Sequence, residues 1–306
     1  MDTQRILAEL QSLVTEQRNP RTRDIDLADL DTVLTLINDE DARVPDVVRG
    51  QIPNIARAVE LAERSLRAGG RLVYMGAGTS GRLGVLDAAE CPPTFGTDPA
   101  QVVGVIAGGS ETLVRSREGI EDRAELAEQD LRDIGLGPRD TLVAITASRR
   151  TPYAVAGLRY ALDAGAATVF ITCNEPPGDL DADVIIAAVV GPEVVAGSTR
   201  MKAGTAQKLI LNMISTATMI RLGKVYENLM VDLRPLSRKL EERSKGILMK
   251  LLDLPYERAA SLLESGQGSV KRALLMGLAG CGAEEAERRL QSAGGVLRRA
   301  LRGERL

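Results

Sequence analysis

One absence decides which side chains can do chemistry in this chain: its 306 residues include no histidine. Histidine general bases, Ser-His-Asp and Cys-His nucleophile pairs and histidine-ligated zinc are therefore excluded. Proton transfer near neutral pH must rely mostly on carboxylates, Lys, Tyr or Cys. The three cysteines, Cys91, Cys173 and Cys281, are far apart and lack C-x-x-C spacing, as expected of reduced thiols in a cytoplasmic protein. We therefore expect neither a metal site nor a cofactor.

A glycine-rich turn, Gly76–Gly81, has the residue types of an anion-binding site. An apolar stretch at 72–75 precedes it, and a helical pattern from Arg82 to about Glu90 follows. Glycines let the backbone approach a ligand closely, and the free N–H groups at a helix N-terminus attract anions. We interpret the turn as a phosphate-binding turn, in which the contacts come from Gly78, Thr79 and Ser80.

The same turn also fits the G-x-G-x-x-G pattern of dinucleotide-binding folds, which is a weak signal by itself. A dinucleotide site needs an acidic residue at the end of the next strand, about 20 residues on. Here that interval holds Glu90–Phe95, which contains two prolines and is not a strand. The next predicted strand ends in Gly108–Ser110. A monophosphate is therefore favoured over a dinucleotide, and a purely structural turn remains the third interpretation.

Apolar runs alternate with helical patterns between residues 72 and 222, which is typical of a parallel sheet covered on both faces. The five predicted strands span 72–75, 102–107, 141–146, 167–172 and 184–190. The predicted helices between and after them span 82–90 (ended by Pro92 and Pro93), 118–131, 152–164 and 202–222. We expect a doubly wound α/β domain that binds its ligand beyond the carboxyl ends of the strands.

Three regions are predicted along the chain. Residues 1–50 form a charged, mostly helical arm, which packs either on its own subunit or on a partner. Residues 51–235 form the α/β domain. Residues 236–306 are rich in Leu, Arg and Glu and form a small unit of three short helices. The breaks predicted in this unit are Leu254-Pro255, Gly266–Gly268, Gly280–Gly282 and Gly294-Gly295.

A second polar turn, Ala147–Tyr153, again combines hydroxyl groups, positive charge and a helix start. Its Ser148 and Thr151 are candidate phosphate contacts. The block Gly191–Lys208 follows the last strand and opens the long helix, with Ser198 and Thr199 as predicted caps. Further candidate contacts here are Ser198 and Lys202. For this block an ordinary capped helix with solvated cations is an equally good interpretation.

Composition argues against several partners. The net charge is -3, with 39 Lys and Arg against 42 Asp and Glu, and only 2% of residues are aromatic. Neither a basic surface for nucleic acid nor an aromatic platform for bases is therefore expected. The N-terminus lacks the pattern of a secretory signal, and no apolar run approaches the length of a membrane span. We expect a cytosolic protein without nucleic-acid or membrane partners.

Three blocks together carry a resemblance to a known family: Gly76–Arg82 with Glu90–Phe95, Thr151–Tyr153, and Gly191–Lys208. They resemble the N-acetylmuramic acid 6-phosphate etherases, which carry a single sugar isomerase (SIS) domain. The third block is also similar to the signature shared with the animal glucokinase regulatory protein. The resemblance extends to Asn38–Asp41 and the C-terminal helices, so it covers essentially the whole chain. One position departs from it, because the family usually has Gly where this chain has Arg149.

The resemblance implies cleavage of the D-lactyl ether of N-acetylmuramic acid 6-phosphate, a step of cell-wall amino-sugar recycling. It also implies a homodimer with the site near the subunit interface. By resemblance, Glu90 protonates the lactyl oxygen and Glu121 removes the C2 proton. From the residues alone, Glu90 ends a helix, where the dipole disfavours a carboxylate, so function would explain its position. Glu121 shares an acidic helical face with Glu118, Asp122 and Glu125, which usually only meets solvent.

Two other interpretations compete with the etherase. An aldose–ketose phosphosugar isomerase would also use a carboxylate at C2, but it would not release lactate. A regulator that only binds a sugar phosphate belongs to a different class. The glucokinase regulatory protein carries two SIS domains in a chain about twice as long. Bacterial transcriptional regulators have a basic helix-turn-helix, whereas residues 1–50 here are acidic.

Overall fold

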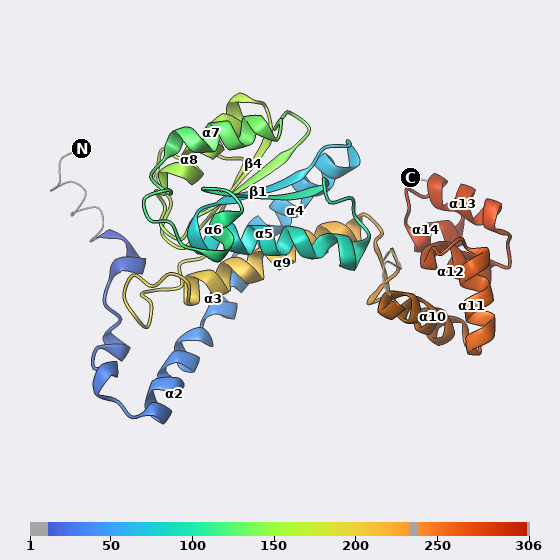
Figure 1. Ribbon diagram of the computed structural model, residues 1–306, viewed down its shortest axis with the longest axis horizontal. Helices are drawn as coiled ribbons and strands as arrows, with labels where there is room; N and C mark the ends of the chain where they lie inside the picture. Colours follow the sequence, from blue (N-terminus) through green and yellow to red (C-terminus); the bar gives the residue numbers. More distant parts are fainter. Residues whose placement is uncertain (1–11, 233–237, 305–306) are drawn as a thin grey trace. The chain divides into compact units, whose positions relative to one another are not determined.

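The computed structural model describes residues 12–232 and 238–304 (Figure 1). Its sheet has five parallel strands in the order β2-β1-β3-β4-β5. The strands are β1 (Leu72–Gly76), β2 (Val102–Ile106), β3 (Thr141–Ile145), β4 (Ala167–Thr172) and β5 (Val184–Ala187). Every residue of β1 and β3 is buried, as in a sheet covered on both faces. The predicted doubly wound sheet is confirmed, with β5 ending three residues earlier than expected.

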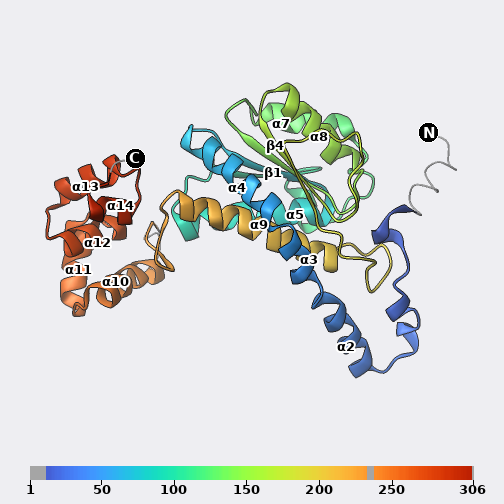
Figure 2. The same cartoon turned by 180° about the vertical axis from the view of Figure 1, so that it is seen from behind.

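Helices cover the two faces of the sheet in two groups. The helices around the sheet are α4 (Ile52–Arg67), α5 (Gly78–Phe95), α7 (Ala124–Asp133), α8 (Pro152–Asp163) and α9 (Lys202–Arg221). Figures 1 and 2 show α7 and α8 on one side and α4, α5 and α9 on the other. Helices α5 and α9 are joined by hydrogen bonds from Asn212 (2.7 Å) and Ser215 (3.1 Å) to the Asp87 carboxylate. This pairing places the two helices side by side.

Two predicted helices have different bounds in the structure. Helix α5 begins at Gly78 rather than Arg82, because the glycine-rich turn is itself the first turn of the helix. It also continues through Pro92 and Pro93, whose missing N–H groups fall in the last turn, and the N–H of Gly96 still bonds to the Pro92 carbonyl at 2.9 Å. The predicted helix 118–131 is shorter. Gly119 adopts a φ of +78°, so a turn separates α6 (Glu111–Val114) from α7.

The described part of the N-terminal arm packs on its own chain. It contains three 3-10 turns, η1 (Val14–Glu16), η2 (Pro20–Thr22) and η3 (Ile25–Leu27), followed by α2 (Leu30–Asp41) and α3 (Val44–Gly50). Asp29 caps α2 by accepting the Thr32 N–H at 2.8 Å. The Thr22 hydroxyl donates to the Val194 carbonyl at 2.8 Å, and the Asn19 amide donates to the Pro192 carbonyl at 3.2 Å. Residues 1–11 of the predicted arm lie outside the described residues.

The chain forms two compact units, whose division differs from the predicted one. The first comprises residues up to Ala89 with Ala100–Ser215, and the second comprises Glu90–Pro99 with the residues from Thr216 on. Residues 216–232 belong to the second unit, where the Asp232 carboxylate pairs with Lys224 (2.8 Å) and Lys271 (2.9 Å). The predicted boundary at 235 therefore falls inside this unit.

Five helices, rather than the predicted three, follow residue 237 in the described part of the second unit. They are α10 (Arg238–Leu252), α11 (Tyr256–Ser265), α12 (Val270–Ala279), α13 (Ala283–Ser292) and α14 (Leu297–Arg302), and a short hairpin of β6 (Val225–Tyr226) and β7 (Leu229–Met230) precedes them. The four breaks recognised in the sequence separate these five helices, so the breaks were right and the number of segments was wrong. No helix in the two described ranges is long and apolar enough to cross a membrane.

Candidate active site

The glycine-rich turn is tight because two of its glycines approach each other closely. A Cβ at Gly81 would lie 2.4 Å from the Gly76 carbonyl oxygen, and one at Gly76 would lie 2.9 Å from the Gly81 nitrogen. Gly78 adopts a φ of +55°, a conformation that favours glycine. Larger residues would therefore open the turn. Because the turn is tight, the N-terminus of the 18-residue helix α5 lies directly after the end of β1, where its free N–H groups can meet an anion.

A cavity of about 310 Å³ lies beyond the carboxyl ends of β1, β2 and β3. Six of the nine predicted site residues line it: Gly78, Thr79, Ser80, Glu121, Ser148 and Thr151. Other charged or hydroxyl-bearing residues of its wall are Glu16, Arg82, Thr112, Ser116, Arg117, Glu118 and Thr199. The structure thus brings together both polar turns and one of the two predicted catalytic carboxylates.

The second polar turn presents a cluster of hydroxyl groups. The Thr151 hydroxyl lies 2.7 Å from that of Thr146 and 3.2 Å from that of Ser148. Thr146 is buried directly after β3. The sequence offered no sign of its role, because it was counted as the last residue of the predicted strand 141–146. In the first turn, the Ser80 hydroxyl donates to the Gln207 side chain at 3.0 Å, so its proton is already used. The hydroxyls of Ser148 and Thr151 are likewise bonded within their own cluster, so a ligand that binds them would replace one of these bonds.

Glu121 occupies a turn before α7 rather than the predicted helical face. It is partly buried, whereas Glu118 and Asp122 beside it are exposed. Its carbonyl accepts the N–H of Tyr153, at the start of α8, at 3.0 Å. Burial and the nearby Asp130 carboxylate raise the pKa of the Tyr153 phenol, whose hydroxyl donates to Asp130 at 2.5 Å. The second polar turn and the Glu121 turn are therefore held together, which sets the position of the Glu121 carboxylate.

Arg82 supports the wall of the cavity between the first turn and Glu121. Its guanidinium donates to the carbonyls of Thr112 (2.5 Å) and Leu113 (3.1 Å) and to the Ser116 hydroxyl (3.4 Å). Together with Arg117 it places positive charge in a cavity that also holds carboxylates. An anionic ligand is therefore balanced by these cations and by the helix N-terminus.

Glu90 is not among the residues that line the cavity. It is exposed, stands twelve residues after Gly78 on α5, and belongs to the second unit. Twelve residues of α-helix correspond to a rise of about 18 Å. Because α5 continues to Phe95, Glu90 is not at the helix end. The helix dipole, which was expected to disfavour its carboxylate, therefore acts on it only weakly.

Lys202 and Ser198, the other two predicted contacts, are likewise not among the residues that line this cavity. The Lys202 ammonium pairs with the Glu40 carboxylate at 2.5 Å, and both side chains are only 1% exposed. The cap of α9 is neither Ser198 nor Thr199. Instead, the Glu193 carboxylate accepts the N–H groups of Lys202 and Ala203, each at 2.9 Å. Burial nevertheless raises the pKa of Glu193. The buried ion pair therefore holds Lys202, at the start of α9, against Glu40 of the N-terminal arm.

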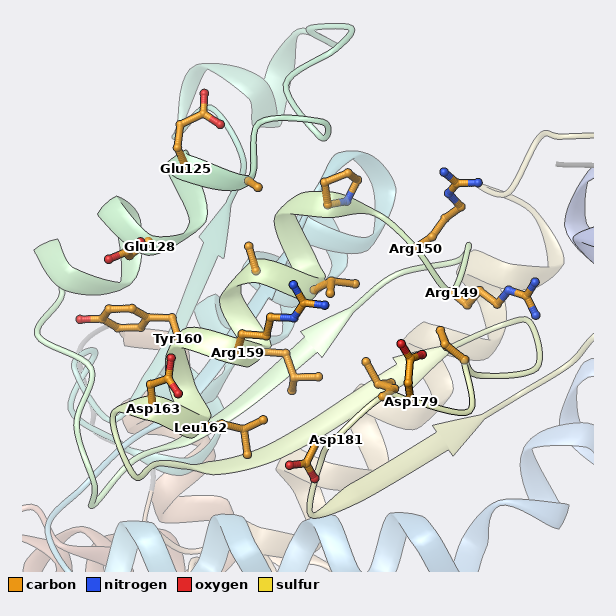
Figure 3. A pocket seen from close by; sticks show the side chains of 17 residues that line it. Glu125, Glu128, Arg149, Arg150, Arg159, Tyr160, Leu162, Asp163, Asp179 and Asp181 are labelled. Carbon is orange, nitrogen blue, oxygen red and sulfur yellow. The ribbon is translucent and has the colours of Figure 1, made fainter. Parts of the chain in front are cut away.

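Arg149, which stands where the family usually has Gly, is not among the residues that line this cavity. Its guanidinium donates to the Ser12 hydroxyl at 3.1 Å and to the Glu175 carbonyl at 3.5 Å. It is not among the non-glycine residues with positive φ, so the turn accepts a side chain here. The larger cavity of about 660 Å³, on the outer side of α8, contains none of the predicted site residues. Figure 3 shows Arg149 extending from its rim, with Arg159 nearer its middle.

We expect Arg149→Gly to lower the free energy of unfolding by about 1 kcal/mol, because it removes the exposed bond to Ser12 and adds backbone entropy to the unfolded chain. The Michaelis constant for the substrate should stay the same. Chemical denaturation and steady-state kinetics measure the two quantities. A rise or fall in the Michaelis constant of about tenfold or more would mean that Arg149 reaches the ligand after all.

This chain resembles known proteins both in one domain and over its whole length. Residues 54–162 match the model of the glucokinase regulatory protein N-terminal SIS domain. The chain is 51% identical over 305 residues to the N-acetylmuramic acid 6-phosphate etherase of Salinibacter ruber, covering 99% of this chain and 98% of that protein. It is 51% identical over 294 residues to the etherase of Mycolicibacterium smegmatis, covering 96% of this chain and 99% of that protein.

Among solved structures, phosphoheptose isomerase from Neisseria gonorrhoeae aligns with a TM-score of 0.45 and 16% identity, covering 61% of this chain and 97% of that one. The relatives named as etherases match at a far higher identity and over the length of both chains. With about half of its residues identical to theirs, this chain belongs to the N-acetylmuramic acid 6-phosphate etherase family.

Proposed function

We propose that this chain cleaves the D-lactyl ether of N-acetylmuramic acid 6-phosphate in the cytoplasm, giving N-acetylglucosamine 6-phosphate and D-lactate. One observation carries the proposal: a partly buried carboxylate, Glu121, shares a cavity with two hydroxyl-bearing turns and a helix N-terminus. Phosphate needs the donors of the turns, and proton abstraction beside a carbonyl needs the carboxylate. Membership of the etherase family supports the same substrate.

The residues of the cavity divide between phosphate binding and proton transfer. The phosphate lies at the N-terminus of α5 and accepts hydrogen bonds from Thr79, Ser148 and Thr151. Opening of the sugar ring exposes the C1 aldehyde, which acidifies the proton on C2. Glu121 takes that proton, and the electron pair of the C2–H bond moves into an enolate of the C1 aldehyde. The enolate then forms the C2=C3 double bond as the C3–O bond breaks. Glu90 protonates the departing lactyl oxygen. Water then adds its hydroxyl to C3 and a proton to C2.

Glu90 reaches the reaction from a second copy of the chain in this proposal. Within one chain, it is separated from the phosphate-binding turn by about 18 Å of helix and does not line the cavity with Glu121. In a two-fold symmetric dimer every contact across the interface occurs twice, so both sites gain a Glu90 from the other copy.

Mixing two inactive variants tests this arrangement. We combine equal amounts of Glu90→Gln and Glu121→Gln under conditions that exchange subunits. If Glu90 acts across the interface, each mixed dimer has one intact site, and activity should return to about a quarter of that of the wild type. If both carboxylates act within one chain, every site carries a lesion and no activity returns.

Exposed apolar side chains support the homodimer. Leu30 (72% exposed) and Leu34 (55% exposed) stand one turn apart on α2, next to the exposed Leu27. Leu86 on α5 and Met213 on α9 are also exposed, at the level where these two helices are joined. Apolar surface of this kind on a soluble chain marks a place where another protein packs.

The double variant Leu30→Asp, Leu34→Asp should therefore be a monomer with little activity, because charges cannot be buried unpaired at an apolar interface. Light scattering gives the oligomeric state, and a lactate assay gives the activity. Thr35→Asp adds a charge to an exposed position of the same helix, off the Leu30–Leu34 row, and serves as the control. A double variant that remains a dimer would exclude α2 from the interface.

The activity itself is tested by NMR with N-acetylmuramic acid 6-phosphate in heavy water. Release of lactate with deuterium at C2 of the product is expected from elimination and hydration. Exchange at C2 without lactate would point to the phosphosugar isomerase instead. Binding without either reaction would favour the regulator that only senses a sugar phosphate.

A further inference from the structure

Glu16 lines the same cavity as Glu121, although it lies in the N-terminal arm, more than fifty residues before the sheet begins. It is the last residue of η1 (Val14–Glu16). Figures 1 and 2 show this part of the arm beside the loop that precedes α9. The arm therefore supplies a third carboxylate to the cavity wall, after Glu118 and Glu121.

Buried hydrogen bonds hold this part of the arm against the sheet. The Asn174 side chain, just after β4, accepts the Val14 N–H at 2.7 Å and donates to the Thr15 hydroxyl at 3.0 Å. The same amide donates to the Ala147 carbonyl at 3.0 Å, in the second polar turn. The Thr15 carbonyl accepts the Gly197 N–H at 3.1 Å. Glu16 is thus positioned from the same framework that positions Ser148 and Thr151.

The Glu16 carboxylate keeps its acceptor capacity for a ligand. Across the described ranges its oxygens have neither an ion pair nor a hydrogen bond, in contrast to Glu40, which has several partners. One oxygen, Oε2, lies 3.2 Å from where a Cβ of Gly197 would stand. Gly197 adopts a φ of +77°, a conformation that favours glycine. Its lack of a side chain also leaves space for the Glu16 carboxylate.

The chemistry of a carboxylate limits what Glu16 can bind. An ionised carboxylate accepts hydrogen bonds and donates none, and a phosphate group has the same character. The two repel each other, so Glu16 does not bind the phosphate. The donors of a phosphorylated amino sugar are its hydroxyl groups and its amide N–H. We propose that Glu16 is a specificity-determining residue of this site, which accepts hydrogen bonds from the sugar and favours it over bare phosphate. The inference rests on the proposed function for the identity of the ligand.

Two ligands that share the phosphate but not the sugar test the inference. We measure by calorimetry the binding of N-acetylglucosamine 6-phosphate and of inorganic phosphate to the wild type, Glu16→Ala and Glu16→Gln. Glu16→Ala should weaken binding of the sugar phosphate by about 10- to 100-fold, because a hydrogen bond to a charged group is lost. Its binding of inorganic phosphate should be unchanged or tighter, because a negative charge has gone. Glu16→Gln, which keeps one acceptor oxygen, should fall in between.

Gln17→Ala serves as the matched control, because Gln17 is exposed in the same segment and does not line the cavity. It should bind both ligands as the wild type does. Equal weakening of both ligands in Glu16→Ala would mean that Glu16 only holds the arm in place, and no weakening of either would mean that it does not meet the sugar. Both results overturn the inference and leave the proposed function intact. A wild type that binds neither ligand would overturn both.

Discussion

Replacing Glu121 with Gln is expected to lower kcat for lactate release by about 100- to 10,000-fold, the range of general base catalysis. The amide has the shape of the carboxylate but cannot take the C2 proton. Because Glu121 is held by the backbone bond from Tyr153 and lines the cavity, the variant should keep its fold and its affinity for the phosphate. Exchange of the C2 proton in heavy water should be lost together with lactate release.

Two further variants separate this effect from a general loss of charge. Asp122→Asn removes a carboxylate from the next residue, which is exposed and does not line the cavity, and it should be fully active. Glu90→Gln should lose lactate release but still exchange the C2 proton, because the base is intact and the acid is missing. Persistent exchange in Glu121→Gln would assign the base to another group.

The second large effect is on stability. Lys202→Met should lower the free energy of unfolding by about 3–5 kcal/mol, the usual cost of removing one partner of a buried ion pair. The Glu40 carboxylate, which is 1% exposed, would lose its closest cation and keep Asn19 (2.9 Å), Arg21 (3.2 Å) and Arg43 (3.4 Å). This cluster joins the arm to the start of α9, so the variant should also loosen the arm. Chemical denaturation at pH 7 measures the loss.

The pH dependence of this loss has a definite sign. Burial by itself would raise the pKa of Glu40, but hydrogen bonds from Lys202 and Asn19 and the charges of Lys202 and Arg43 outweigh it, so the pKa lies below its ordinary value of 4.5. The folded state is therefore stabilised above pH 4.5, and this stabilisation disappears as the pH falls through the lowered pKa. The difference between Lys202→Met and the wild type should narrow over the same interval.

A control with an exposed pair distinguishes burial from charge. Glu128→Gln breaks the ion pair with Arg132 on the surface of α7, where both side chains are more than half exposed. It should change the free energy of unfolding by less than about 1 kcal/mol at any pH. A loss of the same size in both variants would mean that the burial of the Lys202–Glu40 pair is unimportant.

Much of the fold was predictable from local patterns. The strands are short, nearly continuous apolar runs between turn residues, and a parallel sheet covered on both faces leaves that pattern along each strand. The bounds of two helices were predicted wrongly. Helix α5 continues to Phe95 although Pro92 and Pro93 each remove one N–H donor from it, and the N–H of Gly96 still bonds to the Pro92 carbonyl. Gly119, with its positive φ, divides the predicted helix 118–131.

The two polar turns were sufficient to predict a phosphate site. The absence of histidine left carboxylates, Lys, Tyr and Cys as proton carriers, and the resemblance to the etherase family implied carboxylates. The sequence determined this much because residue types and the ends of strands are local properties. Which carboxylates meet that site was decided by tertiary contacts. Glu121 gained its place from the N–H of Tyr153, and Glu16 from the buried side chain of Asn174, 158 positions away in the chain. Lys202, which its pattern made either a candidate ligand contact or a solvated cation, is buried against Glu40. Such pairings join residues far apart in sequence, and no periodicity along the chain encodes them.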